Sequence, residues 1–365
     1  MMGMLHAIGL MSGTSLDGVD AALIETDGHR VGARGPSLSL PYAPALRERM
    51  RDLLDRAPNL SADAPEVREV EHALTLRHAE AVQALRDKAG NPHVDVIGFH
   101  GQTLLHQPLA HRTWQVGDAD LLYRETGIPV VHDFRSADVA HGGEGAPLAP
   151  FYHAALLLGQ ERPVAIVNIG GVANVTLLDT DGRVHACDTG PGNALLDDWA
   201  RLHTGHPCDI DGRLASGGQV DADVLHALLS DPFFSRPAPK SLDRQSFHRA
   251  LSMVSHLSAQ DGAATLAAFT VAGIASVPLP QTPRAWYICG GGVHNPVIMR
   301  GLRETLPGIV APVSGLGWDG DALEAECFGF LAVRSLLGLP ISAPETTGVG
   351  HPLTGGRIVG ARTRA

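Results

Sequence analysis

The stretch IGLMSGTSLDGVDAALIETDG, residues 8–28, decides the fold class of this chain. An apolar strand-like run leads into a glycine-rich turn, and a second strand-like run follows and ends in Asp-Gly. The stretch VNIGGVANVTLLDTDG, residues 167–182, repeats this order of features in the second half of the chain. Two hairpins of one design predict an internally duplicated chain.

Strand-like and helical runs alternate along the rest of the chain, which predicts an α/β fold. Strands are expected over residues 7–11, 19–26, 94–100, 128–134, 164–170, 174–179, 184–188 and 285–291. Helices are expected over residues 43–56, 65–89, 148–158, 193–203, 221–230, 259–275, 295–305 and 320–336. The loop 137–150 is rich in Gly and Pro and predicts a boundary. We therefore expect a first α/β domain over 1–136, joined by 345–365, and a second over 137–344.

Composition excludes several classes of protein. Lys and Arg number 28 against 39 Asp and Glu, a formal net charge of −11 that argues against a nucleic-acid binder. The four cysteines include no CxxC, which indicates a reduced, cytoplasmic compartment. The N-terminus lacks a basic leader, so no signal peptide is expected. The apolar stretch 263–280 is short and ends in prolines, which predicts a buried helix and no membrane partner.

The loop SGTSLDG, residues 12–18, combines glycines, hydroxyl groups and one acid between two strands. Glycine allows the backbone to approach a ligand closely, so successive N–H groups can bind phosphate. Thr14 and Ser15 can add donors, and Asp17 can hold a hydrated Mg²⁺. A plain hairpin with an Asp-Gly turn remains the alternative.

Two further glycine-rich loops follow predicted strands, NIGGVAN at 168–174 and CGGGVHNP at 289–296. In the second loop, Asn295 is expected to cap the next helix, with Pro296 as its first residue. Neither loop forms a complete GxGxxG dinucleotide fingerprint. Three glycine loops at strand ends nevertheless indicate a site for a phosphorylated ligand.

Asp188 is the last residue of a predicted strand and precedes the turn TGPGN, residues 189–193. Ligands of α/β folds gather at the carboxyl ends of strands, and an acid there can accept a proton from a hydroxyl group or water. Asn193 is expected to cap the following helix. A structural acid, hydrogen-bonded to loop N–H groups, is the other interpretation that the spacing leaves open.

Other polar residues lie near predicted strand ends: His100 and Gln102 in FHGQT, Arg135 in HDFR, and Trp114 in TWQVGD. Such residues suit recognition of a sugar or a carboxylate. Each could equally be a packed or loop residue.

Seven segments together resemble the anhydro-N-acetylmuramic acid kinase family over nearly the whole chain. In order they are IGLMSGTSLDGVD, GFHGQT, VVHDFRSADVAHGGEGAPLAP, VNIGGVANVT, DTGPGN, CGGGVHNP and GWDGDALEAECFGFLAVR. The resemblance implies the two-domain, ribonuclease H-like fold of actin-like ATPases and sugar kinases, with a nucleotide cleft between the domains. It also implies peptidoglycan recycling and suggests a homodimer.

The implied reaction converts 1,6-anhydro-N-acetylmuramic acid, ATP and water into N-acetylmuramic acid 6-phosphate and ADP. Asp188 is similar in position to the family's catalytic base. Its proton would come from the water that attacks C1, because O6 is an ether oxygen in this substrate and carries no proton.

The resemblance also implies ATP and Mg²⁺ as the bound cofactors. We hypothesise that His100 and Arg135 contact the sugar and that Arg135 binds its lactyl carboxylate. The expected ATP contacts are Gly13, Thr14, Ser15, Leu16, Asp17, Gly18, Val19, Asp20, Gly170, Gly171, Gly291 and Gly292. Asp17 and Glu326 are the candidate metal ligands.

The chain departs from the family pattern at residues 240–245, where KSLDRQ replaces a sequence close to KSTGRE. We therefore expect no particular role for Lys240.

Three other functions stay open. A kinase for another sugar would use Asp188 on a free hydroxyl group. A non-catalytic actin-like ATPase should carry apolar patches for assembly, and none is evident. A dinucleotide-dependent oxidoreductase is disfavoured by the missing fingerprint.

Overall fold

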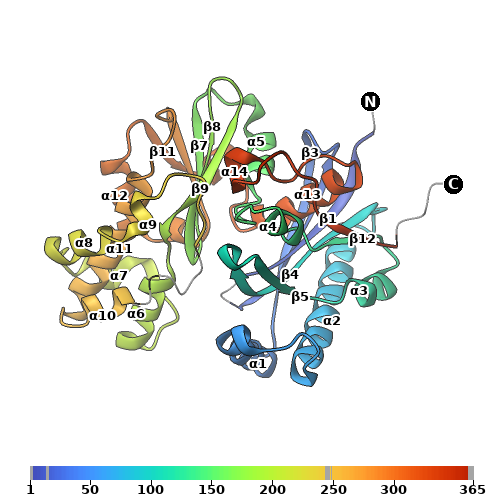
Figure 1. Ribbon diagram of the computed structural model, residues 1–365, viewed down its shortest axis with the longest axis horizontal. Helices are drawn as coiled ribbons and strands as arrows, with labels where there is room; N and C mark the ends of the chain where they lie inside the picture. The colour runs from blue at the N-terminus through green and yellow to red at the C-terminus, as the bar shows by residue number, and fades with distance from the viewer. Residues whose placement is uncertain (1–2, 14–15, 243–246, 248, 361–365) are drawn as a thin grey trace. The chain divides into compact units, whose positions relative to one another are not determined.

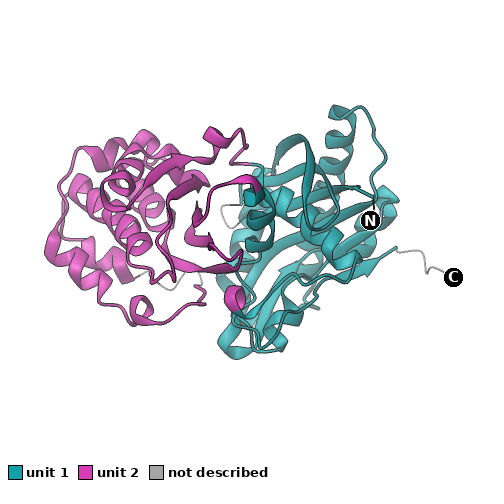
Figure 2. Ribbon diagram, turned by 90° about the horizontal axis from the view of Figure 1, so that it is seen from above, with its two compact units in different colours: residues 1–158, 322–344, 348–365 teal, residues 159–321, 345–347 magenta. Residues whose placement is uncertain are grey.

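The computed structural model describes residues 3–13, 16–242, 247 and 249–360. The chain forms two compact units (Figure 2). Unit 1 comprises residues 1–158, 322–344 and 348–365, and unit 2 comprises residues 159–321 and 345–347. The chain therefore returns to unit 1 after completing most of unit 2.

Unit 1 contains a seven-stranded sheet in the order β12-β6-β4-β1-β2-β3, with β5 paired to β4 (Figure 1). Its strands are β1 (Leu5–Ser12), β2 (Gly18–Thr26), β3 (Val31–Pro41), β4 (Val96–Gln107), β5 (Arg112–Val116), β6 (Val130–His132) and β12 (Arg357–Val359). Its helices are α1 (Pro44–Arg56), α2 (Pro65–Lys88), α3 (Ala119–Thr126), α4 (Ser136–Ala140), α5 (Pro150–Leu156) and α13 (Leu323–Leu336).

Helices cover both faces of this sheet. Ile8 and Leu10 of β1 join the apolar core that includes α1 and α2. The intervening Gly9 faces α13, because alternate residues of a strand project to opposite faces. A Cβ atom on Gly9 would lie 1.7 Å from the Ala325 carbonyl oxygen, and one on Gly98 of β4 would lie 2.0 Å from that of Phe328. Helix α13 therefore packs directly on the backbone of β1 and β4.

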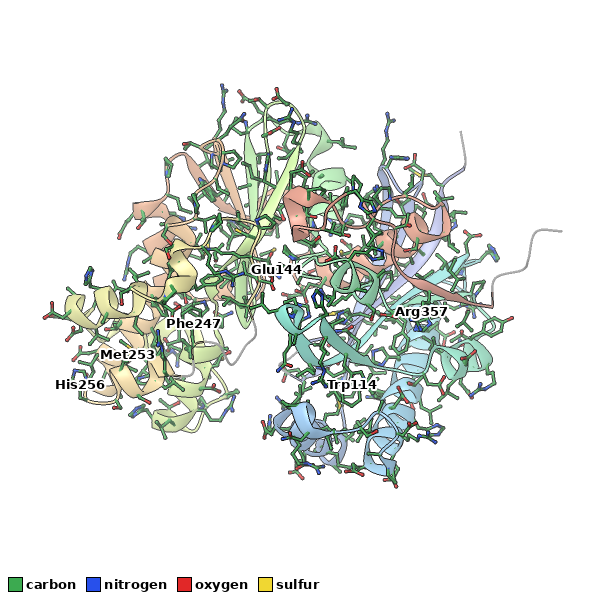
Figure 3. The ribbon with its side chains drawn as sticks, in the orientation of Figure 1. Trp114, Glu144, Phe247, Met253, His256 and Arg357 are labelled. Carbon is green, nitrogen blue, oxygen red and sulfur yellow. The ribbon has the colours of Figure 1, made fainter. Side chains whose placement is uncertain are left out.

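Unit 2 contains a five-stranded sheet in the order β11-β10-β7-β8-β9. Its strands are β7 (Val164–Ile169), β8 (Val172–Leu178), β9 (Val184–Pro191), β10 (Ala285–Cys289) and β11 (Ile309–Pro312). Its helices are α6 (Ala194–Thr204), α7 (Arg213–Ser216), α8 (Ala222–Leu229), α9 (Pro232–Ser235), α10 (Arg249–Val254), α11 (Ala259–Ala275), α12 (Pro296–Thr305) and most of α14 (Pro344–Thr347). Phe247, labelled in Figure 3, packs in the core of this unit.

The two sheets share one topology. In each, the first strand pairs antiparallel with the second and the second antiparallel with the third. The first strand also pairs parallel with the fourth, and the fourth parallel with the fifth principal strand. The spatial order is thus third, second, first, fourth, fifth in both units. This confirms the duplication that the two similar hairpins predict.

Every strand and helix expected from the sequence is present, with ends displaced by a few residues, except that β4 runs seven residues past its predicted end at 100. The expectations missed β3, which is partly exposed and interrupted by Gly and Pro, and also the short strands β5, β11 and β12. The apolar stretch 263–280 lies largely in α11, a buried helix. In the described parts of the chain, no helix is both long and apolar enough to cross a membrane.

The predicted domain boundary differs from the observed division. Residues 137–158 and 322–344, expected in the second domain, belong to unit 1. Helix α13 carries apolar residues around most of its surface, and such a pattern does not say which sheet the helix covers. The glycines of β1 and β4 decide this, because they allow the helix to approach their sheet.

Gly9→Ala tests the close packing of α13. The added methyl group would overlap a backbone oxygen, so the helix must move away from β1. We expect the free energy of unfolding, measured in urea, to fall by about 3 kcal/mol. Gly159→Ala is the control, because nothing lies within 4 Å of a Cβ atom there. Equal stability of the two variants would contradict the packing.

Candidate active site

The glycine loops of unit 2 meet at one end of its sheet, where strands β7, β9 and β10 have their carboxyl ends. Strands β7, β9 and β10 run in the same direction, so their carboxyl ends and the β7–β8 turn lie together. The strand register aligns Cys289, Asn168, Asn174 and Asp188 in one row across four strands. Side chains paired in this way project from the same face of a sheet. The sheet therefore carries two amides and a carboxylate in line at this edge.

Direct hydrogen bonds join the β7–β8 turn to the turn after Asp188. The Gly192 N–H group donates to the Gly171 carbonyl over 2.9 Å, and the Asn193 N–H group donates to that of Gly170 over 2.7 Å. The Asn193 side-chain amide donates to the Ile169 carbonyl over 2.9 Å. The predicted helix cap at Asn193 is therefore wrong, since this side chain ties the two loops together instead.

The glycines at this edge serve two different purposes. A Cβ atom on Gly192 would lie 2.2 Å from the Gly170 carbonyl oxygen, and one on Gly292 would lie 2.4 Å from the Ile169 side chain. Packing alone thus requires these two glycines. At Gly170 and Gly291 a Cβ atom would meet nothing closer than 3.6 and 3.3 Å. Close packing against the backbone therefore does not require glycine at these two positions.

The third loop leads into α12 as predicted. The Asn295 side-chain oxygen accepts hydrogen bonds from the N–H groups of Val297, at 3.0 Å, and Ile298, at 3.3 Å. Pro296 is the first residue of the helix. The cap fixes where the helix begins, and so holds the glycine run that precedes it.

Asp188 is 5% exposed and lies within β9, whose pairing with β8 continues to Pro191. Its Oδ2 atom accepts a hydrogen bond of 2.7 Å from the Leu242 N–H group, and its own N–H group donates to the Lys240 carbonyl over 2.9 Å. The carboxylate is thus buried and oriented by a loop N–H group. A held carboxylate of this kind can act as a general base.

The glycine-rich loop of unit 1 joins β1 to β2. Thr14 and Ser15 lie outside the described residues. Leu16 is buried with a φ of +58°, and Gly18 packs against the Leu40 carbonyl, which a Cβ atom would approach to 2.6 Å. Asp17 is 68% exposed and pairs with Arg47 at 2.6 Å. Val19 is buried in β2, and Asp20 pairs with Met11 across the hairpin.

A buried polar network beneath this loop was not predicted. The Ser12 hydroxyl donates to the Gln102 side chain over 2.6 Å, and the Tyr42 hydroxyl donates to Ser12 over 2.8 Å. The Tyr42 N–H group also donates to the Asp17 carbonyl over 3.1 Å. The network holds both ends of the loop. Gln102 was expected past a strand, but its pairing with Ser12 lies inside β4.

His100 and Arg135 are in direct contact in unit 1. Arg135 donates to His100 Nε2 from Nε, at 3.2 Å, and from Nη2, at 3.0 Å. A guanidinium group can only donate, so the imidazole is neutral and its Nδ1–H group donates to the Gly101 carbonyl over 2.9 Å. Burial, and then the Arg135 charge, hold the pKa of His100 well below its usual range. Arg135 also donates to the Gly145 carbonyl over 2.8 Å.

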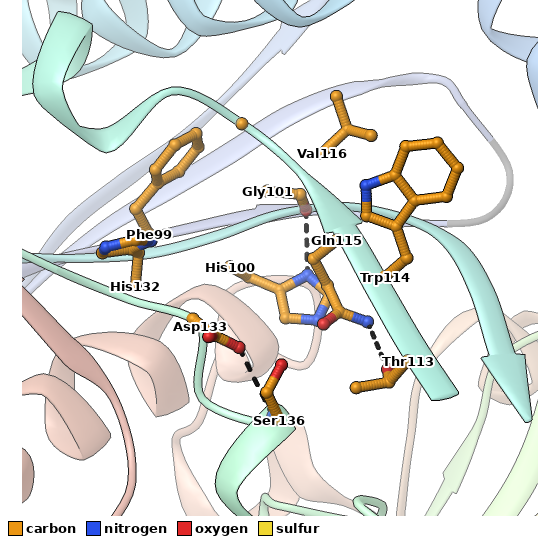
Figure 4. A pocket seen from close by; sticks show the side chains of 11 residues that line it. Phe99, His100, Gly101, Thr113, Trp114, Gln115, Val116, His132, Asp133 and Ser136 are labelled. Atoms are coloured by element: carbon orange, nitrogen blue, oxygen red, sulfur yellow. Dashed lines mark hydrogen bonds between the residues drawn. The ribbon is translucent and has the colours of Figure 1, made fainter. Parts of the chain in front are cut away.

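His100, but not Arg135, lines a pocket of about 250 Å³ (Figure 4). Residues of β4, β5 and β6 and the start of α4 line it: Phe99, His100, Gly101, Thr113, Trp114, Gln115, Val116, Gly117, His132, Asp133 and Ser136. Trp114 and Gln115 belong to β5, which the sequence did not reveal as a strand. The pocket combines an aromatic face with several polar groups, as sugar sites do.

Glu326 was predicted as a candidate metal ligand, with an exposed helical acid as the alternative. The structure instead buries it to 3% exposure in an ion pair with Arg34 at 2.9 Å. The Tyr152 hydroxyl donates a short hydrogen bond to the same carboxylate. Burial and this neighbouring charge raise the pKa of Tyr152. Glu326 therefore joins β3, α5 and α13, which is a structural role.

The repeated sheet, with a glycine-rich hairpin between the first two strands of each copy, agrees with the duplicated two-domain fold that the sequence resemblance implies. A family model described as anhydro-N-acetylmuramic acid kinase matches residues 5–361. The chain belongs to the anhydro-N-acetylmuramic acid kinase family.

Named relatives match the chain over its full length. An anhydro-N-acetylmuramic acid kinase of Gluconobacter oxydans is 62% identical over 98% of this chain and 100% of its own length. One of Acidiphilium cryptum is 60% identical over 97% of this chain and 98% of its own. Among solved structures, a ROK family glucokinase from Streptomyces griseus, in complex with glucose and AMPPNP, is 14% identical over 90% of this chain and 99% of its own, with a TM-score of 0.38.

Buried histidines of unit 1 make stability depend on pH. Burial lowers the pKa of His78, His106 and His153 to about 4 each. Because the unfolded chain binds these protons at higher pH, stability is full above pH 6.5 and is lost as pH falls toward 4. We expect a loss of about 3 kcal/mol per histidine at pH 4, measured by urea unfolding.

His78→Leu is the matched variant for this pH effect. It removes one buried titratable group that packs against Phe99. We expect a shallower decline of stability between pH 6.5 and 4 than in the parent protein. An unchanged pH slope would show that His78 does not contribute.

Proposed function

We propose that this protein opens the 1,6-anhydro ring of 1,6-anhydro-N-acetylmuramic acid by hydrolysis and phosphorylates O6 with ATP. The products are N-acetylmuramic acid 6-phosphate and ADP, and the role is peptidoglycan recycling. The observation that carries the proposal is the family match from residue 5 to residue 361. The arrangement of Asp188 and the glycine loops supports it.

Asp188 is the proposed general base for the attacking water. Water donates a proton to the carboxylate while its oxygen bonds to C1 and the C1–O6 bond breaks. O6 then takes the γ-phosphoryl group, whose bond to the β-phosphate oxygen breaks to release ADP. General-base help of this kind is worth roughly 10²–10⁴-fold. The Leu242 N–H group supports this role, because it orients the carboxylate.

ATP is the proposed phosphoryl donor, held by residues 13–20 and by the backbone at Gly170, Gly171 and Gly291. The space that a Cβ atom would fill at Gly170 and Gly291 fits a closely approaching ligand. Mg²⁺, when bound, neutralises phosphate charge. Asp17 is its candidate ligand, because an exposed ion pair such as that with Arg47 is worth only about 0–1 kcal/mol and is readily exchanged. Glu326 is not included, since Arg34 and Tyr152 occupy its carboxylate.

The sugar is proposed to occupy the pocket beside His100, with Arg135 binding its lactyl carboxylate. The imidazoles of His100 and His106 near the guanidinium group are neutral, so they add no second positive charge where the sugar carboxylate is proposed to bind. Trp114 offers an aromatic face to the sugar ring. The homodimer and the cytoplasmic location remain predictions.

The central test uses purified protein with ATP, Mg²⁺ and the anhydro sugar in ¹⁸O-labelled water. We expect mass spectrometry to show a product heavier than the sugar by one phosphoryl group and one water, with the label at C1. Asp188→Asn should lower the rate by about 10²–10⁴-fold while ATP still binds. Turnover of a sugar with a free hydroxyl group, but not of the anhydro sugar, would support an ordinary sugar kinase instead.

Arg135→Ala tests the lactyl contact. We expect the KM for the sugar to rise by about 10²-fold, the value of a charged hydrogen-bonded pair, with the KM for ATP little changed. The control substrate is 1,6-anhydro-N-acetylglucosamine, which lacks the lactyl group and should lose little affinity in the variant. Equal losses for both sugars would exclude the proposed contact.

A further inference from the structure

The edge of the unit 2 sheet next to Asp188 is covered by loop rather than by a strand. β9 is the outermost strand, and residues 240–242 run beside it. The Asp188 N–H group donates a hydrogen bond to the Lys240 carbonyl, and the Leu242 N–H group donates one to Asp188 Oδ2. Lys240 and Ser241 are both buried. The loop thus forms hydrogen bonds with both the main chain and the carboxylate of Asp188.

The Lys240 side chain anchors this loop to α9. Lys240 is 1% exposed, and its ammonium group donates to the Phe233 carbonyl over 2.9 Å and lies 4.2 Å from the centre of the Phe233 ring. Phe233 in turn stacks edge-on against Phe234 and Phe247. A buried ammonium group is costly without partners, so its contacts define one position for the loop.

The charge of Lys240 also lies near Asp188. Burial, and then the Arg236 charge, lower the pKa of Lys240, whereas Cys187 and, to a smaller extent, Asp188 raise it. The loop therefore connects Asp188 to a rigid aromatic cluster through one buried cation and two main-chain hydrogen bonds.

We propose that Lys240 and the main-chain N–H group of Leu242 are positioning groups for Asp188, through which α9 sets the direction of its carboxylate. This inference rests on the proposed role of Asp188 as the base. Both groups act through Asp188, and neither is proposed to contact the sugar or the attacking water. Their effect is to keep the carboxylate in the orientation that proton removal from water requires.

The contact of Leu242 with Asp188 comes from the backbone and not from the side chain. Any residue except proline supplies that N–H group. The neighbouring positions Asp243 and Gln245 lie outside the described residues.

Leu242→Pro removes the N–H group, and Leu242→Ala is its matched control, because it shortens the side chain and keeps the N–H group. We expect kcat of the proline variant to fall about 10²-fold below that of the alanine variant. The KM values for ATP and sugar, and the thermal midpoint, should be similar in the two. Equal kcat values, or a loss confined to KM, would overturn the positioning role of Leu242.

Lys240→Met supplies a second test, because it removes the ammonium group and keeps an apolar side chain. It tests the positioning role even if the proline variant does not fold. We expect kcat to fall with KM little changed, and Lys240→Arg to recover part of the loss. Full kcat in Lys240→Met would overturn the role of Lys240.

Asp188→Asn separates the two proposals: if that variant is fully active, the base assignment fails. If it is inactive while the Leu242 and Lys240 variants keep full kcat, only the positioning role fails.

Discussion

Direct packing of α13 on the backbone of β1 and β4 is the constraint on which unit 1 depends. Gly9 and Gly98 leave no space for a side chain between sheet and helix. β1 leads into the glycine-rich loop, and β4 carries His100 and Gln102. The same helix brings Glu326 to Arg34 and Tyr152. A helix from the last part of the chain thus supports the first loop and the candidate sugar site together.

The two units use one sheet topology for different chemistry. In unit 2 the edge of the sheet carries a row of polar side chains, ending in Asp188, and glycines on the neighbouring turns. In unit 1 the side chains of Ser12, Gln102 and Tyr42 form a hydrogen-bond network at the corresponding hairpin. A duplicated scaffold therefore presents a proton acceptor in one copy and a cation beside a pocket in the other.

Burial sets the charge state of the groups around that cation. The imidazoles of His100 and His106 are neutral because they are buried and close to Arg135. Their neutrality adds no like charge beside the guanidinium group, and His100 Nε2 accepts two hydrogen bonds from it. In unit 2, by contrast, the buried Asp188 is oriented by a main-chain N–H group. In each case a neutral hydrogen-bonding partner orients an ionisable group.

Local patterns in the sequence determined much of this protein. The paired hairpins predicted the duplicated α/β fold, and strand and helix periodicities placed nearly all the long elements, because both depend on near neighbours in the chain. The pairing of Asn295 with its helix was predictable for the same reason. Tertiary structure alone decided that α13 belongs to unit 1, that Asn193 ties two loops instead of capping α6, and that Glu326 is buried. It also decided that Lys240 and Leu242 hold Asp188. Each of these contacts joins residues far apart in sequence, and their partners depend on which backbones come close enough to touch.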